Sequence, residues 1–190
     1  MRTLAFLLVA VTILASACDV ATPKGLPAES PRAEDQATER AARIYASVIR
    51  QLVTREHTSG ERSVPFERIF VVDRPVDAAG TAYVGGDEAT GGPFPPALES
   101  NILRALTDLP PVRFVGDSAD VIASAKPCPH VGGRDALIGL GPVAKARHDA
   151  VTVASWLSSA CLGGVSATYV LKRAGAGWHV VGTEGPVAIS

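Results

Sequence analysis

The order of residue patterns along the chain limits its fold more than any other feature of the sequence. Helical spacing comes first, over residues 34–56 and 96–108, and strand-like patterns fill the second half. In both segments apolar residues recur three and four positions apart, as on one face of a helix. Pro96 suits the first position of the second helix, and Pro110 lies beyond its end.

Six segments contain the β-branched and aromatic residues that are typical of strands. The last two are joined by residues 174–177, where two glycines suit a tight hairpin turn. Helices followed by such strands predict an α+β fold, with the N-terminal helix and the second helix packed on one face of a curved, mainly antiparallel sheet that ends in a β-hairpin. The predicted strands are 66–73, 112–115, 136–140, 149–156, 165–173 and 178–183, and residues 117–120 predict a single helical turn.

The first 17 residues have the features of an export signal. Arg2 is followed by an apolar run from Leu4 to Ala17, which is too short for a membrane span of ~20 residues. Small residues lead up to Cys18, and this resembles the lipobox of bacterial lipoproteins. We therefore expect cleavage before Cys18, lipidation of its thiol with an acyl chain such as palmitate, and an outer-face, lipid-anchored place at the cell membrane. A plain secretory signal cleaved near Ala17, with Cys18 unmodified, is the alternative.

Residues 18–33 are predicted to be the lipidated cysteine and a tether. Pro23, Pro27 and Pro31 stand among small polar residues, a composition that favours extended chain of up to ~45 Å. The body from 34 to 190 then has the length of a single domain. Loss of Arg2 with the signal changes the net formal charge from −1 to −2, without the basic stripe that a nucleic-acid binder needs.

The closing segments 168–173 and 177–181, with Trp178-His179-Val180, resemble the last hairpin of the NTF2-like superfamily, the cystatin-like α+β roll. In that group a long N-terminal helix fills the concave side of the sheet. The lipobox, the proline tether and the Ala/Gly/Val/Arg-rich composition resemble uncharacterised envelope lipoproteins of high-GC Gram-positive bacteria. The resemblance implies a curved roll and lends no functional residues to this chain.

Two cysteines remain after Cys18 is assigned to lipidation. An exported chain meets oxidising conditions, so we expect Cys128 and Cys161 to form a structural disulfide. Closing this loop of ~33 residues stabilises a fold by roughly 3–4 kcal/mol in the chain-entropy description. The rival interpretation is a metal site, in which His130 and His148 complete a Cys₂His₂ set, but the spacing is unlike that of compact zinc modules.

The segments that resemble motifs for catalysis or cofactor binding each lack a required feature, and we expect no cofactor and no resident metal. Residues 139–144 match G-x-G-x-x-A, yet Pro142 removes a backbone donor and no amphipathic helix follows, so the segment is predicted to be a strand-to-loop turn. Ser166 lacks the second glycine of G-x-S-x-G. His148 and His179 lie at or in strands, where a surface role is expected. His130 is the remaining catalytic candidate, because a rigid loop could position it.

The segment 74–96 is rich in Gly and Pro and longer than an ordinary connection. Its aromatic residues Tyr83 and Phe94 are expected to be exposed and to form a partner-binding loop. We therefore favour a non-enzymatic, membrane-tethered envelope lipoprotein that binds a protein or a small ligand. The alternative is a hydrolase-like envelope enzyme with a site in the sheet concavity near His130.

Overall fold

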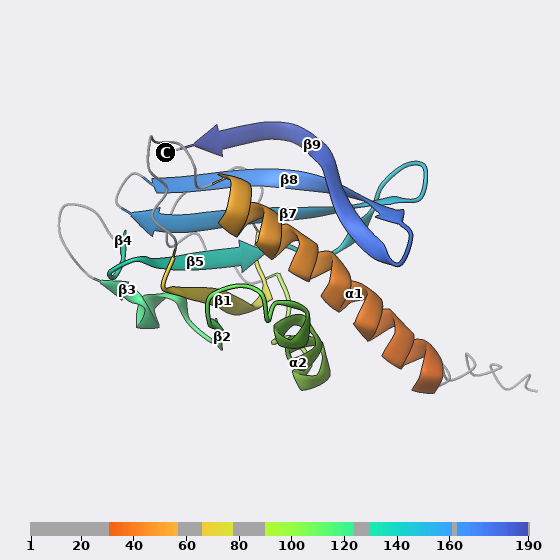
Figure 1. Ribbon diagram of the computed structural model, residues 1–190, viewed down its shortest axis with the longest axis horizontal. Coiled ribbons are helices and arrows are strands. Elements are labelled where there is room, and N and C mark those ends of the chain that lie inside the picture. Colours follow the sequence, from red (N-terminus) through yellow and green to blue (C-terminus); the bar gives the residue numbers. More distant parts are fainter. Residues whose placement is uncertain (1–30, 57–65, 78–89, 124–129, 161–162, 190) are drawn as a thin grey trace, which may run out of the picture.

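The computed structural model describes residues 31–56, 66–77, 90–123, 130–160 and 163–189. The first helix, α1 (Pro31–Gln51), continues into a π-helical turn, η1 (Leu52–Glu56). It begins three residues before the predicted start, because Pro31 occupies the first helical position, where its fixed φ is favourable. The helix therefore includes residues 31–33, which were predicted to belong to the tether. The first half of α1 is exposed and projects beyond the sheet, and its buried residues begin at Ala42 (Figure 1).

Three neighbouring strands run parallel to one another. β1 (Arg68–Pro75) pairs on one side with β2 (Val112–Val115) and on the other with β5 (Asp135–Leu140). The second helix, α2 (Pro96–Ala105), lies between β1 and β2 in sequence, and such a crossover brings the next strand back in parallel. The prediction of a mainly antiparallel sheet is confirmed for the sheet as a whole, but these two parallel pairings were not foreseen.

The second half of the sheet is antiparallel. β7 (Ala150–Ala160), β8 (Gly163–Ala174) and β9 (Gly177–Ile189) pair in chain order, and the short β6 (Ala144–Lys145) pairs with β7. The full order is β2-β1-β5-β7-β8-β9. The predicted closing hairpin is confirmed, because Ala174 pairs with Gly177 and Gly175 takes the positive φ of 58° that its turn requires.

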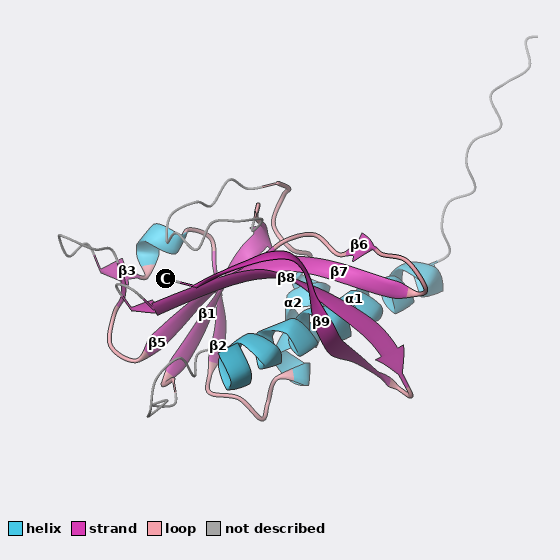
Figure 2. Cartoon of the chain, turned by 90° about the horizontal axis from the view of Figure 1, so that it is seen from above, coloured by secondary structure: helices cyan, strands magenta, loops and turns pink. Residues whose placement is uncertain are grey.

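Both helices lie on the same side of the curved sheet, as predicted (Figure 2). Between them and the sheet lies the main core, which includes Ile49, Ile102, Ile138 and Leu171. A smaller core on the opposite face joins β1 and β5 to the two-stranded sheet of β3 (Ile122–Ala123) and β4 (His130–Val131). Its members are Phe70, Val72, Val76, Val131, Leu137 and Trp156.

Gly139 explains how Trp156 enters this smaller core. The two residues are cross-strand partners in β5 and β7, and a Cβ at position 139 would lie 2.3 Å from Cε2 of the indole. A side chain there would displace the tryptophan, so the strand needs glycine for packing.

The predicted short turn is also present as a 3₁₀ turn, η2 (Ser118–Asp120), in which Asp117 caps the Ala119 N–H at 2.8 Å.

Candidate functional site

The outer face of the antiparallel half carries an open groove. Side chains alternate along a strand, and Val151, Val153 and Leu157 of β7 point into the helix-side core. The intervening positions face the other way, where the smaller core covers only the end near β1 and β5. The groove has a volume of about 920 Å³, within the range of small-ligand sites. It is lined by Lys145, Ala146, Arg147, His148, Ala150, Thr152, Val170, Lys172 and Glu184.

Positive charge dominates the lining of this groove. Lys145, Arg147 and Lys172 come from β6, the β6–β7 turn and β8, and all three side chains are exposed. Within the part of the chain that the structure describes, none of the three forms an ion pair, and Glu184 is the single carboxylate that lines the groove. Their charge is therefore available to an anion from outside.

The turn between β6 and β7 has an unusual backbone. His148 and Asp149 both have φ of 57°, a left-handed conformation that favours glycine. The turn is closed by the Ala150 N–H, which donates to the Arg147 carbonyl at 3.3 Å, and by the Ala146 N–H, which donates to the Ala150 carbonyl at 3.0 Å. Mirror-image turns of this kind match the twist of a hairpin, but they usually contain Asn-Gly or Asp-Gly. Here His148 and Asp149 take the positions of Asn and Gly, and the turn places an imidazole at the groove.

A smaller pocket of about 300 Å³ lies on the helix side of the same hairpins, and its cations are partly used to hold α1 in place. The Arg40 guanidinium lies 5.1 Å from the centre of the Trp178 ring, a cation–π distance. Arg43 pairs with Glu39 and donates to the Ala176 carbonyl at 3.2 Å. The pocket is lined by Gln36, Glu39, Arg40, Arg43, Arg173, Ala176 and Trp178.

At the opposite end of the sheet, charges are paired. Arg68 binds the buried Asp135 carboxylate with two nitrogens, at 2.6 and 3.1 Å, and the hydrogen bond and charge of Asp135 raise the pKa of Arg68 further. Next to this pair, Arg134 binds Glu67. Asp135 is the first residue of β5 and Arg68 is the first residue of β1. The ion pair between them therefore fixes the parallel register of the two strands and has a structural role.

Two carboxyl groups, those of Glu99 and Asp108, have pKa values that their immediate surroundings shift. Partial burial and the charge of Asp73 raise the pKa of Glu99, and Asp73 itself accepts a hydrogen bond from Arg74 at 2.8 Å. The hydrogen bonds from Arg50 lower the pKa of Asp108 and tie α1 to the end of α2. Over the described residues, no group of three or more His, Cys, Asp or Glu side chains has the arrangement of a metal site.

The candidate residues predicted from the sequence differ in where the structure places them. Phe94 is buried, with 6% of its surface exposed, and its ring packs against Tyr45 and Phe114, so the expectation of an exposed Phe94 that binds a partner is wrong. His130 lies in β4, but its side chain is outside the described part of the structure. Cys18, Tyr83, Cys128 and Cys161 also lie outside the described residues, so the lipid anchor and the disulfide stay predictions.

The sequence search missed the groove. His148 and His179 are exposed as expected, but the cluster around His148 was not recognised because its members come from three parts of the chain. A usable signal was present: Lys145, Arg147 and the pair Lys172-Arg173 are basic residues placed next to turns. The segment 139–144, in contrast, leads into β6 and not into a helix, which confirms that it is no dinucleotide fingerprint.

The chain matches no family model, no curated protein and no solved structure. Among the helices that the structure describes, none combines the length and the apolar character needed to cross a bilayer.

Proposed function

We propose that this chain is a lipid-anchored envelope protein that binds an anionic ligand and has no catalytic role of its own. The lipobox-like segment that ends at Cys18 supports the anchor. The groove supports the ligand class, since three cations that have no ion pair within the described residues, Lys145, Arg147 and Lys172, meet on one open surface. That convergence is the observation that carries the proposal.

The chemistry of the lining favours an oxyanion such as a phosphate or a carboxylate. Arginine and lysine donate several hydrogen bonds and accept none, so they suit oxygen-rich anions. Thr152 adds a hydroxyl to the lining, and Val170 adds an apolar side chain. Glu184 at the β9 side repels a highly charged ligand from that edge and so limits where the anion sits.

Pyrophosphate provides a direct probe of the groove. In the exported chain with Cys18→Ser, we expect pyrophosphate to shift the backbone amide signals of residues 145–150 and 170–172 in an NMR titration. The double variant Arg147→Ala with Lys172→Ala should weaken binding at least about tenfold, because each charged hydrogen bond contributes ~1.5–3 kcal/mol. The matched control is Arg104→Ala with Arg113→Ala, which removes two exposed cations from α2 and β2 and should leave binding within about twofold.

Two results would overturn the ligand-binding proposal: no amide shifts in the groove, or an equal loss of affinity in both double variants.

The lipid anchor is tested by a separate experiment. The wild-type chain expressed in a bacterium should fractionate with membranes and incorporate a labelled fatty acid, whereas Cys18→Ser should lose both properties. Incorporation of label in Cys18→Ser would refute lipidation at Cys18.

A further inference from the structure

The end of the molecule that carries the groove is also the end where the tether joins. Both hairpin turns, β6–β7 and β8–β9, lie at the same end as the projecting first half of α1 (Figures 1 and 2). In the sequence, Pro31 follows Cys18 by 13 positions, and a chain of this length spans at most about 45 Å. If Cys18 is lipidated, as the proposed function requires, this end of the molecule lies close to the bilayer.

Exposed basic side chains gather at this hairpin end. The six basic residues are Arg40, Arg43, Lys145, Arg147, Lys172 and Arg173. Two imidazoles, His148 and His179, lie at the same end, with three acidic residues, Glu39, Asp149 and Glu184. The first turn of α1, which lies at the same end, adds one basic and two acidic residues, so this end has seven basic and five acidic residues, whereas the rest of the described chain has seven basic and nine acidic ones. The molecule is therefore polarised, with its positive pole at the end of the tether.

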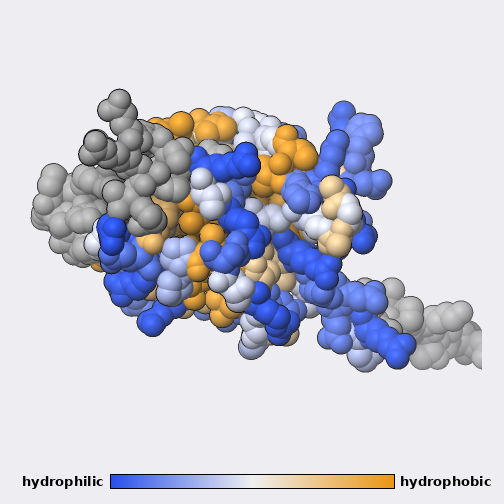
Figure 3. All heavy atoms as spheres, in the orientation of Figure 1, coloured by the Kyte–Doolittle hydropathy of each residue, from blue (hydrophilic) through white to orange (hydrophobic). Residues whose placement is uncertain are grey.

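The pairing of these charges differs between the two ends. Arg50, Arg68, Arg74 and Arg134 each bind a carboxylate elsewhere in the fold. At the hairpin end Arg43 pairs with Glu39, but among the residues that are described Lys145, Arg147, Lys172 and Arg173 form no ion pair. Figure 3 shows hydrophilic side chains over the hairpin tips and over the projecting half of α1. Unpaired cations keep their long-range attraction for an anionic surface.

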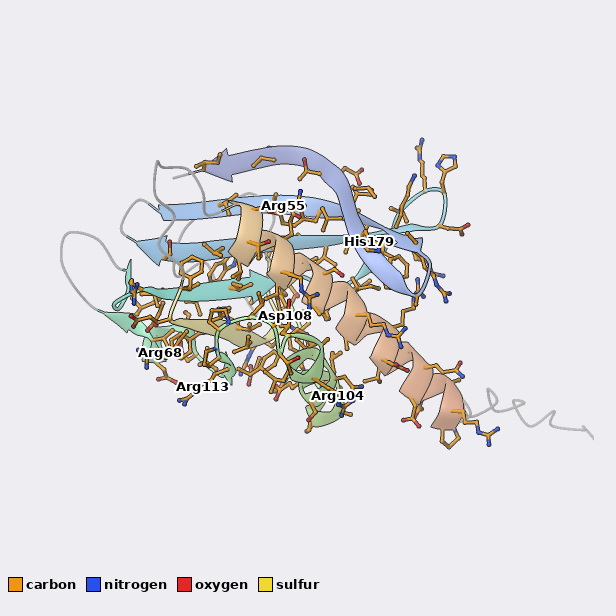
Figure 4. The ribbon with its side chains drawn as sticks, in the orientation of Figure 1. Arg55, Arg68, Arg104, Asp108, Arg113 and His179 are labelled. Carbon is orange, nitrogen blue, oxygen red and sulfur yellow. The ribbon has the colours of Figure 1, made fainter. Side chains whose placement is uncertain are left out.

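The distribution of the cations favours a surface over a compact ligand. Lys145, Arg147 and Lys172 point to the outer face of the sheet, and Arg40 and Arg173 line the pocket on the helix side. Cations on both sides of the hairpins can contact a layer of headgroups at the same time, whereas a small anion would contact only one group of them. His179 of β9 lies between the hairpin turns and the body, as Figure 4 shows.

We propose that the hairpin end docks on the anionic phospholipid headgroups of the membrane to which the chain is anchored. The proposal rests on the proposed function, because it makes headgroup phosphates the ligand of the groove. The anchor holds the body near the bilayer at high effective concentration, and the basic residues then orient it with the groove against the headgroups. Each basic residue adds to the attraction within about a Debye length, ~10 Å at 0.1 M salt.

Vesicle binding without the lipid anchor tests this docking. The exported chain with Cys18→Ser should co-sediment with vesicles of phosphatidylcholine and phosphatidylglycerol and not with phosphatidylcholine alone, and added salt should weaken binding. Arg147→Ala with Lys172→Ala should weaken binding to the anionic vesicles about 10- to 30-fold. The control pair, Arg104→Ala with Arg113→Ala, lies on α2 and β2, away from the hairpin tips (Figure 4), and should change binding by less than about threefold.

The outcomes separate this inference from the proposed function. Binding of pyrophosphate without binding of anionic vesicles overturns membrane docking and keeps the anion-binding groove. Equal binding to both vesicle types, or equal loss in both double variants, also overturns docking at the hairpin end. Failure of both pyrophosphate and vesicles to bind overturns the proposed function together with this inference.

Discussion

The two halves of the sheet differ in what covers them and in how their charges are used. The parallel strands β2, β1 and β5 lie between the helices on one face and the smaller core on the other, and every side chain of β5 is buried. The antiparallel strands β7, β8 and β9 are covered by α1 on one face and leave a groove on the other. This follows a general rule: parallel sheets are covered on both faces, whereas antiparallel sheets tolerate solvent on one.

The difference in cover explains the difference in charge. In the parallel half, the buried Asp135 needs Arg68, because an ionised carboxylate away from water must be compensated. On the open face of the antiparallel half, Lys145 and Lys172 are hydrated and need no partner from the protein. The paired charges hold the sheet together, whereas the cations of the groove, which form no ion pair within the described part of the chain, can attract a ligand.

Removal of one cation from each half should separate these roles most strongly. We expect Arg68→Ala to lower the free energy of unfolding several times more than Lys172→Ala does, because it leaves the Asp135 carboxylate buried without its partner. Lys172→Ala should change it by less than about 0.5 kcal/mol, as exposed substitutions usually do. Urea unfolding at neutral pH measures both. Equal losses in the two variants would mean that the charges of the two halves do not differ in role.

The covered face of the sheet can be tested through Tyr45 of α1. Its hydroxyl donates to the Gly141 carbonyl at 3.3 Å, its ring packs against Phe94, and burial raises its pKa from 10.0 to about 12. The unfolded chain therefore ionises first. The stability associated with the neutral hydroxyl is complete below pH 10 and is lost as the pH rises toward 12, by about 2–3 kcal/mol in total.

Tyr45→Phe provides the control for this pH dependence, because it removes the hydroxyl and keeps the ring. The variant should be about 1 kcal/mol less stable than the wild type at pH 8, since one hydrogen bond is lost. Between pH 10 and 12 the gap should close and then reverse, because only the wild type pays for keeping a neutral hydroxyl buried. Parallel pH profiles for the two proteins would show that Tyr45 is hydrated in the folded state.

The sequence predicted those parts of the fold whose signals are local. The spacing of apolar residues identified α1 and α2, and two glycines identified the β8–β9 turn. The parallel pairing of β1 could not be predicted in this way, because Val71 pairs with Phe114 and Ile138, 43 and 67 positions further along the chain. For β1 and β2 the crossover through α2 decides the strand direction.

Burial of the loop aromatic and assembly of the groove also depend on distant contacts. Phe94 stands among glycine and proline residues, which are typical of exposed loops, yet Tyr45 and Phe114 provide a pocket for its ring. Lys145 and Lys172 are 27 positions apart, and they line one groove only because β6 and β8 flank β7. The turn predicted at residues 174–177 joins β8 to β9 and takes no part in bringing these two lysines together.

The smallest expected effect concerns the β6–β7 turn and distinguishes stability from binding. His148→Gly and Asp149→Gly should each raise the free energy of unfolding by about 0.5–1 kcal/mol, because glycine adopts a φ of 57° without the steric cost of a Cβ. Asp117→Gly is the control, since Asp117 has a φ of −138° and caps η2, and its loss should destabilise the chain. The two turn variants should then differ in their affinity for pyrophosphate.

His148→Gly removes a lining residue and should bind more weakly, whereas Asp149→Gly removes a nearby negative charge and should bind at least as tightly. If both variants gain stability and bind as the wild type does, the strained imidazole has no part in the groove, and Lys145, Arg147 and Lys172 must account for binding without it.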